Sequence, residues 1–111
     1  MSTITWNDFE KIDIRVGTII KAEEFPEARK PAYQLTIDFG ELGTRKSSAQ
    51  ITNHYNVQSL VGQQVIAVTN FPPKKIASFT SECLVLGIYD ENGSVVLLQP
   101  QKQVSNGLKI G

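Results

Sequence analysis

A strict alternation of side-chain types is the feature that most limits the folds open to this chain. Apolar or β-branched residues stand at every second position from Ile12 to Ile20 and again from Tyr33 to Phe39. A period of two places one set of side chains on one face of a strand, whereas a helix requires a period of about 3.6 residues. Both stretches are therefore predicted to be half-buried β-strands.

The remaining segments extend this pattern, with two short helices between strands. The sequence Asp90-Glu91-Asn92-Gly93 is a hairpin signal between two further apolar runs. The other predicted strands are Thr44–Thr52, Val65–Val68, Leu84–Tyr89 and Val95–Leu98. A helix is predicted over Trp6–Lys11, capped by Thr5, and a short helix or turn over His54–Leu60.

The order of these elements predicts the fold class. We expect an all-β OB-fold, which is a five-stranded Greek-key barrel, with the second helix between strands three and four. A short N-terminal helix and a C-terminal β extension would flank the barrel. The 111 residues suit a single domain over residues 1–111.

Composition and missing motifs exclude several classes of protein. No apolar run approaches the roughly 18 residues of a membrane span, and the N-terminus lacks the pattern of a signal peptide. The single cysteine, Cys83, excludes an internal disulfide and a Cys-rich metal site, and His54 has no second histidine as a partner. The chain also lacks a phosphate-binding glycine motif and a nucleophile setting around Ser47 and Ser48. We therefore expect a cytoplasmic protein that is not an enzyme and uses no cofactor.

Positive charge is gathered into pairs although the chain is neutral overall. The pairs are Arg29-Lys30, Arg45-Lys46 and Lys74-Lys75, and we predict that they converge on one rim of the barrel. The last pair lies in Asn70–Ile76, where two prolines end a strand and stiffen a loop beside Phe71. In such a loop the cations can bind a phosphate and the ring can stack on a base. The alternative is that the basic pairs lie in solvated turns that bind nothing. OB-folds bind ligands at the places that Arg45-Lys46 and Lys74-Lys75 occupy, and Arg29-Lys30 leads into the second strand, which favours a nucleic-acid-binding surface.

Five short motifs, spread over nearly the whole chain, carry a family resemblance. They are Asp13–Ile19, Ile37–Gly40, Leu60–Gly62, Asn70–Ile76 and Ser81–Leu86. In this order they resemble the tRNA-binding OB-fold domain family, which occurs in methionyl-tRNA synthetases and in the endothelial monocyte-activating polypeptide. Within that family, further segments are similar to a branch of small bacterial chaperones of protein secretion: Glu24–Arg29, Pro31-Ala32, Ser47–Thr52 and Val96–Pro100.

The resemblance implies a homodimer built through both terminal segments and tRNA binding on the concave face of the barrel. In the chaperone branch it also implies binding of unfolded or exported polypeptides. The residues that it assigns to nucleic-acid binding are Asn70, Lys74 and Ser81, and those added from position alone are Arg15, Arg45, Lys46, Gln50 and Lys75. An ion pair between Asp13 and Arg15 that orders the first strand is an equal alternative for Arg15.

Two functions thus stay open: a tRNA-binding module, and a polypeptide-binding chaperone with no role for tRNA. A chaperone needs an exposed apolar patch or a free strand edge. The loop residues expected to form such a patch are Phe25, Phe71, Pro73 and Phe79, and the alternative is that they pack onto the barrel. Salt separates the two functions, because phosphate contacts weaken at moderate salt whereas apolar contacts persist.

Overall fold

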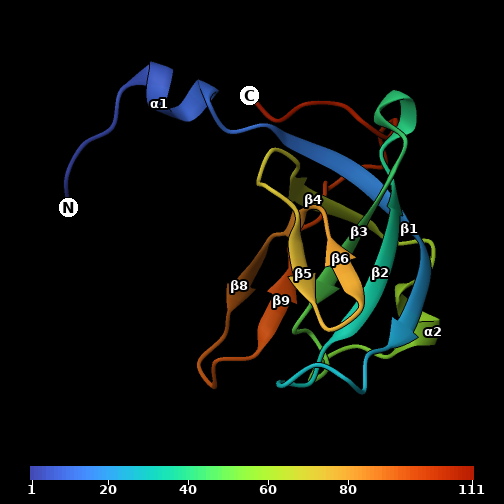
Figure 1. Cartoon of the computed structure of the whole chain (residues 1–111). Coiled ribbons are helices and arrows are strands. Elements are labelled where there is room, and N and C mark those ends of the chain that lie inside the picture. The colour runs from blue at the N-terminus through green and yellow to red at the C-terminus, as the bar shows by residue number, and fades with distance from the viewer.

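The structure is a computed structural model that describes residues 1–111, and it is mostly β with only short helices (Figure 1). Five antiparallel strands form one curled sheet in the order β3-β2-β1-β4-β7, and two small hairpins are attached to it. This nearly closed barrel, with α2 between β3 and β4, is the OB-fold-like architecture that the sequence predicts. In chain order the elements are α1 (Trp6–Glu10), β1 (Ile14–Glu24), β2 (Tyr33–Asp38), η1 (Gly40–Leu42), β3 (Thr44–Ala49), α2 (Val57–Leu60), β4 (Gln64–Val68), β5 (Lys74–Ile76), β6 (Phe79–Ser81), β7 (Leu84–Val85), β8 (Gly87–Tyr89) and β9 (Val95–Leu97).

The long strand β1 is covered on both faces, which differs from the one-sided burial predicted from its alternation. Gly17 and Ile19 face the core, whereas Ile20 is left unpaired at the register shift between Ile19 and Lys21 and is exposed. On the other face, Val16 is also buried, and the C-terminal tail runs along the edge of β1, where the Val16 amide donates to the carbonyl of Leu108 at 3.1 Å. The shift therefore moves the core-facing side of β1 from Gly17 and Ile19 to Ala22, which packs against the core.

Strand β3 and the residues before β7 come together and close one end of the barrel. The Glu82 amide donates to the carbonyl of Lys46 at 2.7 Å, and the Ser47 hydroxyl donates to the carbonyl of Cys83 at 3.0 Å. β3 ends at Ala49, three residues before the predicted end. These bonds bring the β5–β6 hairpin, which directly precedes Glu82, next to β3.

The single strand predicted over Leu84–Tyr89 is divided in two. The Leu86 amide donates to the carbonyl of Ile66 at 2.8 Å, so the chain stays beside β4 up to this residue. The Leu86 carbonyl accepts from the amide of Leu98 at 3.2 Å. Because Leu86 bonds to both segments, the chain leaves the barrel there and continues as the separate β8–β9 hairpin.

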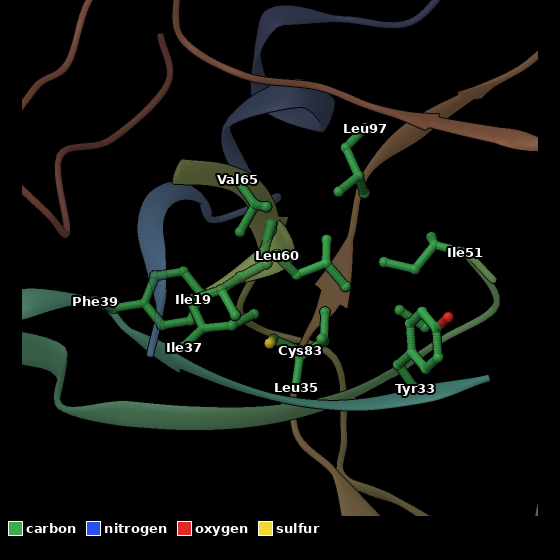
Figure 2. Packing of buried hydrophobic residues seen from close by; sticks show 12 residues of the cluster. Ile19, Tyr33, Leu35, Ile37, Phe39, Ile51, Leu60, Val65, Cys83 and Leu97 are labelled. Atoms are coloured by element: carbon green, nitrogen blue, oxygen red, sulfur yellow. The ribbon is translucent and has the colours of Figure 1, made fainter. Parts of the chain in front are cut away.

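The main core lies inside the barrel, and Figure 2 shows side chains from β1, β2, β4, β9 and α2 pointing toward one another. Phe39, Leu35 and Ile37 are among its largest fully buried side chains. Gly17 makes room for two of them. A Cβ at that position would lie 2.6 Å from Cγ2 of Ile37 and 2.8 Å from the ring of Phe39.

Helix α1 stands apart from the barrel on an N-terminal arm (Figure 1). Thr5 caps it as predicted: the Asp8 amide donates to Oγ1 of Thr5 at 3.1 Å, and the Thr5 amide donates to Oδ2 of Asp8 at 3.0 Å. None of the residues of α1 is buried. No helix in the chain has the length and apolar character needed to cross a membrane.

Candidate nucleic-acid interface

Two of the three basic pairs line one surface groove of about 520 Å³. The groove lies between the loop of residues 25–32, which joins β1 to β2, and the β5–β6 hairpin. Its charged lining residues are Arg29, Lys30, Lys74, Lys75 and one carboxylate, Glu27, and its uncharged polar lining residues are Ser48 and Gln50. We call it the basic groove. A chain with no net charge therefore presents four cations against one anion on a single face.

A small second core holds the two walls of the basic groove together. Phe25 from the loop and Phe79 from β6 pack their rings with centroids 5.3 Å apart, and Ala32 joins them. Each ring is more than nine-tenths buried, and burying one stabilises the fold by about 2 kcal/mol. Phe25 and Phe79 were expected on an exposed peptide-binding patch. Both rings are instead buried, as expected from the alternative that these loop residues pack onto the barrel.

An apolar cleft of about 330 Å³ adjoins the basic groove, and Lys74 lines both. Phe71 lines the cleft with its side chain 55% exposed, so its ring face is open to a base. Ser81 stands opposite Lys74 in the β5–β6 ladder and also lines the cleft. Pro73 is exposed in the loop before β5. A cation, a hydroxyl and a ring therefore meet where the groove and the cleft join.

The third basic pair lies outside the basic groove. Arg45 stands opposite Ile37 in the β2–β3 ladder, on the core side of β3, whereas Lys46 stands opposite Thr36 on the outer side. Neighbouring residues of a strand point to opposite faces, so the side chains of Arg45 and Lys46 leave β3 on opposite sides, and neither lines the basic groove. The predicted convergence therefore holds for two pairs and is wrong for Arg45-Lys46.

Arg15 and Asn70 are both engaged at the start of β1. Nη2 of Arg15 lies 3.0 Å from Oδ1 of Asp13, and Nη1 donates to the carbonyl of Gly107 at 3.0 Å. The hydrogen bond from Arg15 is the main cause that lowers the pKa of the Asp13 carboxyl. In the side chain of Asn70, Oδ1 accepts from the backbone amide of Asp13 at 3.0 Å, and Nδ2 donates to the carbonyl of Lys11 at 2.7 Å. The ion pair considered for Arg15 is thus present, and both side chains order the backbone around Asp13.

Cys83 and His54 are not parts of a reactive or metal-binding group. Burial raises the pKa of the Cys83 thiol to about 12, which keeps it protonated and unreactive. Nε2 of His54 lies 2.7 Å from Oδ2 of Asp90, and this contact is the main cause of the lowered pKa of Asp90. Histidine, cysteine and carboxylate side chains form no group of three or more that would hold a metal ion.

Arg29 and Lys30 are predicted only as one of the basic pairs, and neither they nor Ser48 are among the residues assigned to nucleic-acid binding from the sequence, yet all three line the basic groove. The signal for the two cations is present in the sequence as a pair between Pro26 and Pro31. The second core brings this pair close to Lys74, and it does so through contacts between residues that are far apart in the sequence. Of the predicted set, Lys74, Lys75 and Gln50 line the basic groove and Ser81 lines the adjoining cleft.

Residues 14–109 match the family model described as "Putative tRNA binding domain". The chain belongs to this family. The resemblance inferred from the five ordered motifs is thereby confirmed. A curated relative of this tRNA-binding domain, the methionine–tRNA ligase of Methanococcoides burtonii, is 38% identical over 104 residues, which is 94% of this chain and 15% of the ligase. The chain spans only about 15% of the length of the ligase, and the ligase activity is not transferred to it.

Solved structures share the fold over nearly the whole chain. The chaperone CsaA of Bacillus anthracis is 56% identical with a TM-score of 0.94, covering 99% of this chain and 100% of that one. The CsaA chaperone protein of Picrophilus torridus is 54% identical with a TM-score of 0.92, covering 98% and 100%. A MetRS related protein of Pyrococcus horikoshii is 27% identical with a TM-score of 0.88, covering 100% of both chains.

Proposed function

We propose that this tRNA-binding domain is a non-catalytic homodimer of the CsaA type that binds tRNA in the basic groove, in the cytoplasm. The observation that carries the proposal is the meeting of Arg29, Lys30, Lys74 and Lys75 around one groove in a neutral chain. Membership of the tRNA-binding family supports the choice of tRNA over other polyanions.

The geometry of the groove gives each part of an RNA strand a partner. The four cations would neutralise successive phosphates, and Ser48 and Gln50 would donate to or accept from ribose hydroxyls. The exposed ring of Phe71, beyond Lys74, would stack on an unpaired base. tRNA offers such bases in its single-stranded ends and loops.

A second copy of the chain is the proposed partner of the N-terminal arm. Ile4 and Trp6 are 69% and 66% exposed, and α1 buries no residue against its own barrel. Leu108 in the C-terminal tail is exposed as well. Apolar side chains on an arm that leaves the barrel (Figure 1) favour burial in another subunit. Sedimentation velocity should give a dimer for the native chain and a shift toward monomer for Trp6→Ala, whereas a monomeric native chain would refute this part.

Fluorescence anisotropy of labelled tRNA tests the groove. The variant Lys74→Ala/Lys75→Ala removes two cations of the basic groove, and the matched control Lys21→Ala/Lys102→Ala removes two cations that do not line it. Removing a single phosphate-binding cation should reduce affinity several-fold, so we expect the groove variant to bind about 10- to 100-fold more weakly at low salt.

The control variant separates a groove from diffuse charge. If both double variants weaken binding equally, the affinity for tRNA depends only on the overall charge of the protein, and the assignment of the basic groove is refuted. If the native chain does not bind tRNA at low salt, the tRNA function itself fails.

A second part of the proposal is a chaperone role in protein secretion, with unfolded or exported polypeptides as partners. The similarity to proteins described as CsaA chaperones supports it. Exposed apolar side chains outside the basic groove, among them Leu84, Ile88 and Tyr89, offer contacts for a chain that is not folded. Retention of reduced, carboxymethylated α-lactalbumin on the immobilised protein at high salt would support this role. A failure to retain it at any salt would leave a tRNA-binding protein with no chaperone function.

A further inference from the structure

The barrel is closed at one end of its seam and open at the other. At the closed end, Lys46 bonds to Glu82, and the Ser48 amide donates to Oγ of Ser81 at 3.1 Å. Beyond these bonds no ladder joins β3 to β7, which are the two outermost strands of the five-stranded sheet. Two strand edges therefore diverge from a common closed end.

Both edges of the open part carry backbone groups without a hydrogen-bond partner. The Leu86 amide bonds to β4. The backbone N–H and C=O groups of successive residues point to opposite edges of a strand, so those of Val85 point away from β4 and into the seam. On β3 the backbone of Lys46 points to the seam, so the Ser48 carbonyl and the Gln50 amide, on the same edge, point there too. No strand is paired with β3 or β7 on the side that faces the seam, so these groups have no ladder partner within the chain.

A cleft of about 440 Å³ occupies this open seam, and its lining contains no charged side chain. Buried residues of the main core, Ala49 and Ile51, form part of its floor, and Tyr89 from the β8–β9 hairpin stands at its rim. The lining residues are Ser48, Ala49, Gln50, Ile51, Leu84, Val85, Leu86, Gly87, Tyr89, Gly93 and Val95. With no cation present, this seam cleft offers nothing to a phosphate backbone.

We propose that the seam cleft is the site for polypeptide, and that it takes an uncharged, extended segment as an added strand between β3 and β7. The two edges run parallel to each other, since each is antiparallel to a strand of an antiparallel set. The inserted segment would bond to both edges and rest its apolar side chains on the core residues beneath. Addition of a strand in this way supplies affinity through the main chain and so accepts many sequences. The inference rests on the polypeptide-binding part of the proposed function.

The probe is a fluorescent, end-capped hexapeptide with alternating threonine and valine, which is uncharged and prone to extend. Two further versions carry N-methyl groups on the three valine amides or on the three threonine amides. An inserted strand uses the donors of both its edges, so each version should bind at least tenfold more weakly than the unmethylated peptide. Binding should not change with salt or in Lys74→Ala/Lys75→Ala.

On the protein side, Val85→Pro removes one seam-facing donor, and Val85→Thr keeps that donor in a side chain of the same shape. Val85 bonds to no other strand through its amide, so proline is tolerated there as on an edge strand. We expect at least a tenfold loss of peptide affinity for Val85→Pro and less than a threefold loss for Val85→Thr. If Val85→Pro fails to fold, the methylated peptides and NMR of the native chain test the insertion instead. Addition of the hexapeptide should then change the backbone amide chemical shifts of residues 48–51 and 84–87.

Each other result overturns the insertion. Loss of affinity with only one methylated version means pairing with a single edge, and no loss with either means an apolar contact without strand pairing. If the hexapeptide does not bind at millimolar concentration while carboxymethylated α-lactalbumin is retained, the chaperone role stands and the seam cleft is not its site. If neither binds, the polypeptide function itself has failed.

Discussion

Gly17 allows the sharpest test of how the barrel packs. In Gly17→Ala the new Cβ would lie 2.6 Å from Cγ2 of Ile37 and 2.8 Å from the ring of Phe39, whereas carbon atoms prefer about 3.5–4.0 Å. Both neighbours are fully buried, so relief requires them to shift within a packed core, at about 1–3 kcal/mol. Alanine recovers about 0.5–1 kcal/mol because it is less flexible than glycine when unfolded. The net loss of unfolding free energy should be about 1.5 kcal/mol, which lowers Tm by about 6–10 °C for a domain of this size.

Thermal and urea unfolding followed by circular dichroism measure this loss, and a double-mutant cycle assigns its cause. In a Phe39→Leu background the ring is absent, so Gly17→Ala should cost at least about 0.5 kcal/mol less than in the native chain. Strict additivity of the two substitutions would show that the ring contact is not the source. A melting temperature of Gly17→Ala within about 2 °C of the native value would refute the packing argument altogether.

Three further predictions concern the second core, the hairpin and the thiol. Phe79→Ala should destabilise the fold by about 3 kcal/mol and weaken tRNA binding even at temperatures where the variant is folded, because the loop with Arg29 loses its anchor; unchanged anisotropy titrations would contradict this. Because the pKa of Asp90 is lowered in the fold, its carboxylate stabilises the folded state above about pH 4. This contribution is lost as the pH falls through the lowered pKa. The Tm of the native chain should therefore fall more between about pH 4 and pH 2 than the Tm of Asp90→Asn. Cys83, with its pKa raised to about 12, should react with Ellman's reagent at about pH 8 only after unfolding in guanidinium, and rapid labelling of the native chain would show that it is not buried.

Local signals predicted the fold well. The continuous apolar run Val65–Val68 is a strand buried along its whole length, and Thr5 caps the first helix as predicted. The break between β7 and β8 was not predicted, because it depends on the bonds of Leu86 to Ile66 and Leu98. Neither of those partners can be identified from the run Leu84–Tyr89 itself.

The candidate site was predicted in part, for a similar reason. The basic pairs are visible in the sequence, but the contact of Phe25 with Phe79 decides which of them meet. The same two rings were expected on the surface because they lie in loop segments of the sequence. Asn70 stands in a family motif, yet the oxygen and the nitrogen of its side-chain amide both bond to the backbone near Asp13, a contact between segments that are distant in sequence.

The salt dependence of tRNA binding tests the central claim most directly. If the four cations of the basic groove contact phosphates, log K against log salt concentration should have a slope of about −3, so that affinity falls about 60-fold between about 50 and 200 mM salt. In Lys74→Ala/Lys75→Ala the slope should become shallower by about 1.5, while Lys21→Ala/Lys102→Ala keeps the native slope. A slope near zero, or one that both double variants change equally, would contradict the account.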